Sequence, residues 1–141
     1  MKKAIIVTDL GFGDSNKGVT IQALTRRHRA KVVIRFSGGC QAGHNIVLED
    51  GTHHTFAQFG SGTFDGARTH LSQFMVVHPK AMEIEASYLQ RRANIQDPFQ
   101  GVTVDRRALV ISPFHQSMNR LLELSRGAAS HGTCGAGVGQ T

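Results

Sequence analysis

Cysteine is scarce in this sequence. The two cysteines, Cys40 and Cys134, are far apart and belong to no C-x-x-C pair. This spacing argues against a structural zinc site and against a disulfide framework, and it suits a reducing compartment. The sequence therefore predicts a cytoplasmic protein, in which we expect Cys40 to be a small buried residue.

Long apolar runs are missing as well. After Lys2 and Lys3, only residues 4–7 (AIIV) are apolar before Thr8 and Asp9. Such a run is too short for a signal peptide and far shorter than the ~20 residues of a membrane-spanning helix. We therefore predict a soluble protein without a membrane partner.

Aromatic residues are few. The chain has no tryptophan and one tyrosine, and its basic residues occur in small groups with little aromatic interleaving. Proteins that bind nucleic acid typically combine a basic stripe with aromatic side chains. The net charge of +6 suits a small anionic ligand instead, and we expect no nucleic-acid partner.

Glycine, by contrast, is abundant and gathers in loops. There are 16 glycines among 141 residues, and a content of 40% hydrophobic and 18% charged residues is typical of a globular domain with a core. Clustered glycines allow a backbone to approach a ligand closely. The glycine-rich loops are residues 11–18, 37–44, 59–64 and 130–141.

The first of these loops, residues 11–18 (GFGDSNKG), follows the apolar run 4–7 and precedes a helix expected at Lys17–His28. A strand, a glycine-rich turn and a helix form the usual cradle for a nucleotide phosphate. Backbone N–H groups at the helix N-terminus face the anion, and a lysine adds a full positive charge. The spacing from Gly11 to Lys17 is that of the phosphate-binding pattern G-x-x-x-x-G-K.

Three residues of this loop depart from that pattern. Asn16 replaces the second glycine, but asparagine tolerates a left-handed backbone, so the turn can still form. Gly18 stands where a magnesium-binding serine or threonine is usual. Asp14 would repel a phosphate unless it binds a metal ion or does proton chemistry on a second substrate. The simpler alternative is an ordinary strand–turn–helix joint with Asp14 near the helix N-cap.

The order of the other elements predicts an α/β fold. Strands expected at residues 4–7 and 31–36 flank the first helix, which makes a βαβ unit and implies a parallel sheet. We therefore predict a mainly parallel sheet flanked by helices, with a P-loop-like nucleotide-binding region and a β-hairpin insertion. The remaining elements are the hairpin at residues 46–56, strands at 71–77, 102–104 and 109–111, and helices at Pro79–Ala93 and between Ser112 and Gly127.

Three finer features follow from local sequence. The turn Asp50-Gly51 favours the positive φ angles of a tight hairpin turn. His53 and His54 straddle a hairpin strand, so one of them should face solvent. A stripe at helical spacing is expected in the core: Ala81, Ile84 and Tyr88.

The end of the chain is unusual for a complete fold. Residues 130–141 (SHGTCGAGVGQT) are rich in glycine, and an unanchored glycine loop stays disordered. We therefore expect the chain to be a fragment, or half of a larger enzyme.

Four segments together resemble the N-terminal third of adenylosuccinate synthetase. Their order and separations agree along the whole chain, which makes the combination more specific than any one motif. The family patterns are G-D-E-G-K-G-K, R-Y-x-G-G-x-N-A-G-H-T, V-V-x-P-x-A and R-G…I-G-T-T-G-R-G-I-G. The matching segments are residues 13–19 (GDSNKGV), 35–45 (RFSGGCQAGHN), 76–81 (VVHPKA) and 126–139 (RGAASHGTCGAGVG).

The resemblance implies a GTP-dependent carbon–nitrogen ligase that joins aspartate to C6 of a purine nucleotide through a 6-phosphoryl intermediate. It implies Mg²⁺ as cofactor and a homodimer. By the same resemblance, Asp14 would remove the purine N1 proton and bind the metal, because an amide-like oxygen is a poor nucleophile until that proton leaves. His44 would donate a hydrogen bond beside the transferring phosphoryl group, and the Gly43 carbonyl would be a metal ligand.

The binding residues are also carried over from the resemblance. For GTP they are Gly13, Ser15, Asn16, Lys17, Gly18, Val19, Gly43, His44 and Asn45. For the acceptor nucleotide they are Asp14, Ser15, Asn16, Lys17, Gln41, Ala42, Thr133 and Cys134.

Several positions differ from the family pattern, and most of them face the acceptor. They are Ser15, Asn16, Val19, Gln41, Cys134 and Ala136. Losing a hydroxyl donor and a cationic side chain should weaken binding of a 5′-phosphate. This implies an acceptor shifted from IMP toward a modified or deoxy purine nucleotide, or toward a purine-like antibiotic precursor. The retained Asp14 argues against the phage relatives that act on deoxyguanosine monophosphate.

Two other functions remain open. A different P-loop kinase or GTPase would need a serine or threonine after Lys17, where Gly18 stands. An inactive fragment or subunit that binds a nucleotide or a partner chain is the second alternative.

Overall fold

The computed structural model describes residues 3–11, 13 and 15–141. Its centre is a parallel sheet in which β1 (Val32–Gly38) pairs with β4 (Arg68–Val77). Along the other edge of β4 lie β5 (Val102–Val104), opposite residues 69–71, and β6 (Leu109–Val110), opposite residues 76–77. All three pairings are parallel, which confirms the predicted α/β class.

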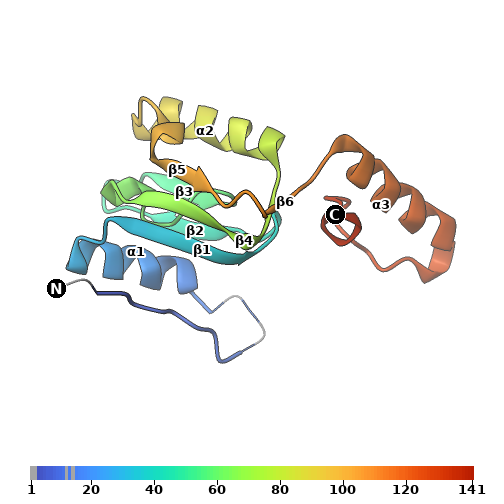
Figure 1. The fold of residues 1–141 in the computed structure, drawn as a ribbon, viewed down its shortest axis with the longest axis horizontal. Helices are drawn as coiled ribbons and strands as arrows, with labels where there is room; N and C mark the ends of the chain where they lie inside the picture. The colour runs from blue at the N-terminus through green and yellow to red at the C-terminus, as the bar shows by residue number, and fades with distance from the viewer. Residues whose placement is uncertain (1–2, 12, 14) are drawn as a thin grey trace.

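Helices cover both faces of this sheet, as Figure 1 shows. α1 (Lys17–His28) lies on one face and α2 (Pro79–Ala93) on the other, with the bounds that the sequence predicts. α2 begins where local sequence favours a start, because Pro79 needs no N–H partner in the first turn and the His78 ring accepts a hydrogen bond from the Ala81 N–H. The short 3-10 turns are Thr63–Asp65, Pro98–Gly101, Gly127–Ala129 and Val138–Gln140.

The expected β-hairpin is present as a separate two-stranded sheet of β2 (His44–Val47) and β3 (His53–Phe56). Its turn is not the expected one. Gly51 has a φ of 83°, but Asp50 does not have a positive φ. The Leu48 carbonyl accepts from the Gly51 N–H, and the Leu48 N–H donates to the Thr52 carbonyl. The connection is therefore a wider turn that needs one left-handed residue, not two.

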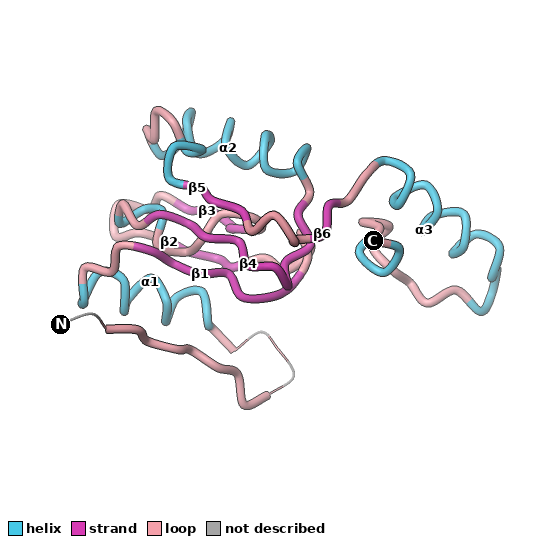
Figure 2. Tube along the Cα trace, viewed as in Figure 1, coloured by secondary structure: helices cyan, strands magenta, loops and turns pink. Residues whose placement is uncertain are grey.

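The strand predicted at residues 4–7 is wrong. These residues form no strand in the described part of the chain, and Ile5 and Ile6 are 42% and 85% exposed. Figure 2 shows the N-terminal segment running past α1 on the side away from β1. A strand exists only when a neighbour accepts and donates its backbone hydrogen bonds. An apolar run by itself does not supply that neighbour.

The core lies between β4, the hairpin and α2. Its buried side chains are Ile46, Phe56, Phe59, Leu71, Met75, Val77, Met82, Ala86 and Leu89. The predicted stripe on α2 is wrong, because Ile84 is 64% exposed and Tyr88 is 38% exposed. The helix instead turns Met82, Ala86 and Leu89 inward, together with one carboxylate, Glu85.

α3 (Pro113–Arg126) projects beyond the end of the sheet (Figure 1). It begins after Ser112 and ends before Gly127, as predicted. The chain after it folds back onto α3, since the buried Asn119 side chain donates to the Thr133 hydroxyl and accepts from the Gly137 N–H. The glycine-rich tail is thus anchored, unlike the loop that composition alone suggested. No helix among the described residues is long and apolar enough to cross a membrane.

Candidate functional site

The start of β2 and the start of α1 meet at His44 and Gly18. A Cβ added to Gly18 would lie 2.7 Å from the Cβ of His44 and 3.3 Å from its Cα. Only a residue without a side chain lets the hairpin approach the helix this closely. The geometry therefore brings together the first glycine-rich loop and the histidine that the resemblance identifies as catalytic.

His44 lies in an environment that disfavours its charged form. Burial, followed by the positive charges of Arg35 and Lys17, lowers the pKa of His44 from 6.5 to about 4. The Ser61 hydroxyl lies 3.5 Å from His44 Nδ1. At neutral pH the ring is therefore uncharged and keeps one N–H to donate.

Lys17 is already paired with a carboxylate. Its Nζ donates to Asp9 Oδ2, and the Gly11 N–H donates to Asp9 Oδ1 at 3.0 Å. The Lys17 ammonium, with further hydrogen bonds from Ser15 and Gly11, holds the pKa of Asp9 well below its usual range. An incoming phosphate would have to replace Asp9 as the partner of this lysine.

The turn before α1 has the predicted backbone. Asn16 adopts φ 59° and ψ 24°, so asparagine does take the left-handed conformation that the missing glycine would have supplied. Asn16 is the N-cap of α1, and its side chain makes no capping hydrogen bond to the helix. Gly13 has a φ of 110°, Ser15 is exposed, and Val19 is 49% exposed on α1.

Asp14 lies outside the described residues, so its expected roles as base and as metal ligand stay predictions. Gly43 packs against the hairpin, where an added Cβ would lie 2.7 Å from Thr55 Cγ2. The Asn45 side chain accepts a 2.9 Å hydrogen bond from the Thr55 hydroxyl. Among the residues described, no three histidine, cysteine, aspartate or glutamate side chains form a group that could hold a metal ion.

The second glycine-rich loop meets the tail of the chain. A Cβ on Gly39 would lie 2.7 Å from Val138 Cγ2 and would also collide with the Gln41 side chain. Cys40 is only partly buried, in contrast to the expectation. Burial, with a smaller contribution from the charge of Cys134, raises the pKa of its thiol. The two loops predicted to bind the acceptor therefore lie close to each other.

Thr133 and Cys134 sit at the start of this tail. The Thr133 hydroxyl accepts from Asn119 at 2.9 Å, and its N–H donates to Glu123 at 3.2 Å. Cys134 is exposed. Ala42, from the other loop, gives its carbonyl to the Arg35 guanidinium at 3.2 Å.

The sequence did not predict a second polar cluster behind the site. Glu85 from α2 is buried and accepts hydrogen bonds from three consecutive backbone N–H groups, those of residues 57–59. His54 is buried and its Nε2 lies 3.3 Å from Glu85, whereas His53 is exposed, which confirms that one of the pair faces solvent. A charged residue within an apolar segment could have indicated this cluster. Arg35 is such a residue in the strand sequence VVIRF, and Glu85 is another, three residues after Met82.

Sequence comparison finds related proteins along nearly the whole chain. The sequence profile of adenylosuccinate synthetase matches residues 6–141. The adenylosuccinate synthetase of Exiguobacterium sp. (strain AT1b) is 35% identical over 137 residues, which are 96% of this chain and 30% of that protein. The synthetase of Porphyromonas gingivalis is 30% identical over 142 residues, covering 100% of this chain and 32% of that protein. The chain thus spans about a third of the length of these relatives.

Two solved structures resemble the fold. Fully ligated adenylosuccinate synthetase from Plasmodium falciparum superposes with a TM-score of 0.75 at 23% identity, over 90% of this chain and 29% of that one. Succinoaminodeoxyadenylate synthetase from cyanophage S-2L, bound to dGMP and dATP, gives a TM-score of 0.61 at 21% identity, over 78% and 30%. At these identities the two structures support the fold. Together with the profile match from residue 6 to the last residue, the sequence relatives show that this chain belongs to the adenylosuccinate synthetase family.

Proposed function

We propose that residues 1–141 carry the phosphoryl-transfer part of a carbon–nitrogen ligase. The enzyme would use GTP to phosphorylate O6 of a purine nucleotide and then join aspartate to C6. The observation that carries this proposal is the close approach of His44 to the N-terminus of α1, at Gly18. The neutral histidine lies beside a helix start, which is a favourable place for an anion.

The proposed steps follow from these positions. Lys17 and the N–H groups of the first turn of α1 would hold the GTP phosphates, after the lysine exchanges Asp9 for the anion. Asp14 would take the proton from purine N1, which makes O6 a better nucleophile. His44, uncharged because of its lowered pKa, would donate its N–H to the oxygen where negative charge develops.

Magnesium would be held by the Asp14 carboxylate and the Gly43 carbonyl, since both are the hard oxygen donors that Mg²⁺ prefers. When bound, the ion would neutralise charge on the transferring phosphate. Gln41 and Ala42, with Thr133 and Cys134 from the neighbouring tail, would contact the acceptor nucleotide.

The acceptor has two candidates. IMP is the family substrate, but Cys134 stands where the family pattern has the phosphate-binding threonine, which favours a deoxy or otherwise modified purine nucleotide. The cyanophage enzyme with the related fold is bound to dGMP. The retained Asp14 argues against dGMP as the acceptor. Binding of IMP and of dGMP therefore has to be compared directly.

We further propose that this segment is the N-terminal portion of an incomplete α/β domain in a cytoplasmic homodimer. The exposure of Ile6 and of the α3 side chains Phe114 and Leu121, at 85%, 81% and 66%, supports an incomplete domain. The chain also matches only about a third of the length of its relatives, which supports an incomplete domain as well.

Calorimetry on the longest natural form of the protein, with Mg²⁺ present, tests the nucleotide site. We expect GTP to bind, and we expect Lys17→Met to weaken binding tenfold or more because the amine of a phosphate-binding lysine is lost. Lys80→Met is the matched control, since Lys80 is exposed and pairs with Glu83 on α2. Equal GTP affinity in Lys17→Met and in the unchanged protein would refute the site.

Phosphate release with GTP, aspartate and either IMP or dGMP tests the reaction. We expect His44→Ala to slow phosphate release by about 10²–10³-fold, because the side chain that donates a hydrogen bond to the developing charge is removed. Full turnover in this variant would remove His44 from the mechanism. A natural form that binds nucleotide but never releases phosphate would favour the inactive-subunit alternative.

A further inference from the structure

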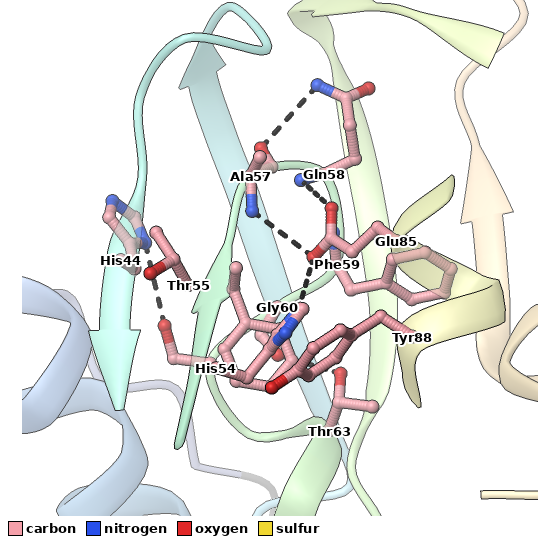
Figure 3. A network of polar contacts seen from close by, with 12 residues as sticks. His44, His54, Thr55, Ala57, Gln58, Phe59, Gly60, Thr63, Glu85 and Tyr88 are labelled. Carbon is pink, nitrogen blue, oxygen red and sulfur yellow. Dashed lines mark hydrogen bonds and ion pairs between the residues drawn. The ribbon is translucent and has the colours of Figure 1, made fainter. Parts of the chain in front are cut away.

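Residues 56–59 lie between two buried side chains of opposite charge. From β1, the Arg35 guanidinium donates to the carbonyls of Phe56 and Phe59, at 3.4 and 3.2 Å. From α2, the Glu85 carboxylate accepts from the N–H groups of residues 57–59, at 3.2, 2.7 and 3.3 Å. Figure 3 shows the Glu85 side chain meeting this segment. A cation thus binds the carbonyls and an anion binds the amides of one short peptide, which we call the clamped segment.

Both charges are deeply buried, since Arg35 and Glu85 are each 6% exposed. A buried charge is costly unless hydrogen bonds replace its lost hydration. The backbone of the clamped segment supplies most of these bonds, so its conformation is fixed by the need to satisfy both groups. The His54 ring lies 3.3 Å from the same carboxylate and is stacked on Tyr88.

Two contacts connect the clamped segment to the surroundings of His44. Arg35 also donates to the carbonyl of Ala42, two residues before His44. Ser61, which follows the clamped segment, contacts His44 Nδ1 through its hydroxyl. The chain between them is held as well, because the Gly60 N–H donates to the Thr69 hydroxyl at 2.9 Å. Displacement of the clamped segment would therefore move the surroundings of His44 on both sides.

We propose that Glu85 is a positioning residue of the ligase site: by holding the amides of residues 57–59, it sets the place of His44 through Ser61 and Arg35. The inference rests on the role of His44 under the proposed function. Glu85 itself belongs to α2 and bonds to backbone and to His54, so it acts through other groups. A purely stabilising role for Glu85 is the alternative that the test has to separate.

The decisive variant is Glu85→Gln, which keeps the size of the side chain but turns an N–H₂ group toward N–H donors. Glu83→Gln is the matched control: it makes the same change two residues away on α2, at an exposed side chain.

Amide hydrogen exchange measures directly how firmly Glu85 holds the backbone of residues 57–59. We expect the amides of residues 57–59 to exchange about tenfold faster or more in Glu85→Gln, with α1 and β4 unchanged, because local opening becomes easier. Glu83→Gln should exchange like the unchanged protein.

Steady-state kinetics of the longest natural form of the protein test whether Glu85 positions His44. We expect kcat to fall by about 10²-fold in Glu85→Gln with KM for GTP within twofold, since a shift of about 1 Å in a catalytic group has this effect. Glu85→Asp, which keeps the charge, should recover part of kcat. Equal kcat in Glu85→Gln and Glu83→Gln would overturn the proposal, even where exchange at residues 57–59 is faster.

Two further variants keep the test decisive. Ser61→Ala leaves the clamp intact and removes the contact to His44, so we expect kcat to fall while exchange at residues 57–59 stays unchanged. If Glu85→Gln does not fold, full activity in Ser61→Ala together with Glu85→Asp overturns the proposal. His44→Ala separates the two hypotheses: full turnover in His44→Ala refutes the proposed function, whereas inactivity there with full activity in Glu85→Gln refutes only the positioning role.

Discussion

Gly18→Ala is the substitution that tests the site geometry most directly. The added methyl carbon would lie 2.7 Å from His44 Cβ, which is about 1 Å short of the ~3.5–4.0 Å optimum for two carbon atoms. His44 Cα is also within 3.3 Å, so a change of rotamer does not relieve the contact. The start of β2 has to move away from α1, and His44 moves with it.

The stability change follows from two opposing effects. Overpacking of this kind costs about 1–3 kcal/mol, whereas alanine is favoured over glycine in a helix by up to about 1 kcal/mol. The helix gain is reduced at Gly18 because it lies in the first turn of α1. We therefore expect the free energy of unfolding to fall by about 1–2 kcal/mol, measured by urea denaturation.

Gly101→Ala is the control for this experiment. The nearest atom to a Cβ at Gly101 is Arg68 Cα at 3.7 Å, an ordinary contact, so we expect a change within about 0.5 kcal/mol. Calorimetry should also find weaker GTP binding in Gly18→Ala than in Gly101→Ala. Equal stability and equal GTP affinity in the two variants would show that His44 does not pack on the helix start as described.

The remaining predictions concern pH and the tail. The pKa of His44 is about 4 in the folded protein, against 6.5 ordinarily, so the unfolded chain binds more protons between these values. The free energy of unfolding should fall as pH drops from 6.5 to 4, by at most about 3 kcal/mol and by roughly 1 kcal/mol once solvent screening of this partly exposed ring is included. His44→Asn should lose this part of the pH dependence in acid titrations followed by circular dichroism, and an unchanged profile would contradict the lowered pKa. Asn119→Ala should destabilise the tail by about 1–3 kcal/mol, because Thr133 and Gly137 lose their partner. Limited proteolysis should then cut residues 130–141 first, and resistance equal to that of the unchanged protein would argue against this anchor.

Local features of the chain were predictable because their causes are local. Pro79 and Ser112 set the starts of α2 and α3, and Asn16 took the left-handed turn that its side chain tolerates. These effects act within a few residues of the chain. The α/β class was predicted correctly, but the βαβ unit used to predict a parallel sheet was wrong at its first strand. The parallel pairs observed are those of β4 with β1, β5 and β6.

Other features depended on partners far along the chain. The run at residues 4–7 has strand-forming residues but pairs with no strand among the described residues. The α2 helix has two apolar faces, one with Ile84 and Tyr88 and one with Met82, Ala86 and Leu89. The spacing of these residues does not tell which face packs against the core. The buried face includes Glu85, whose carboxylate finds three backbone N–H partners in residues 57–59, far from it in sequence.

The sequence by itself determined the family, the helices with their ends, and which residues are candidates for chemistry. The tertiary structure alone decided that His44 lies against Gly18, that Lys17 is paired with Asp9, and that Arg35 and Glu85 hold one segment between them. The physical reason is that backbone conformation and capping depend on neighbours in sequence. Burial, charge pairing and close approach depend on neighbours in space, which the order of residues does not specify.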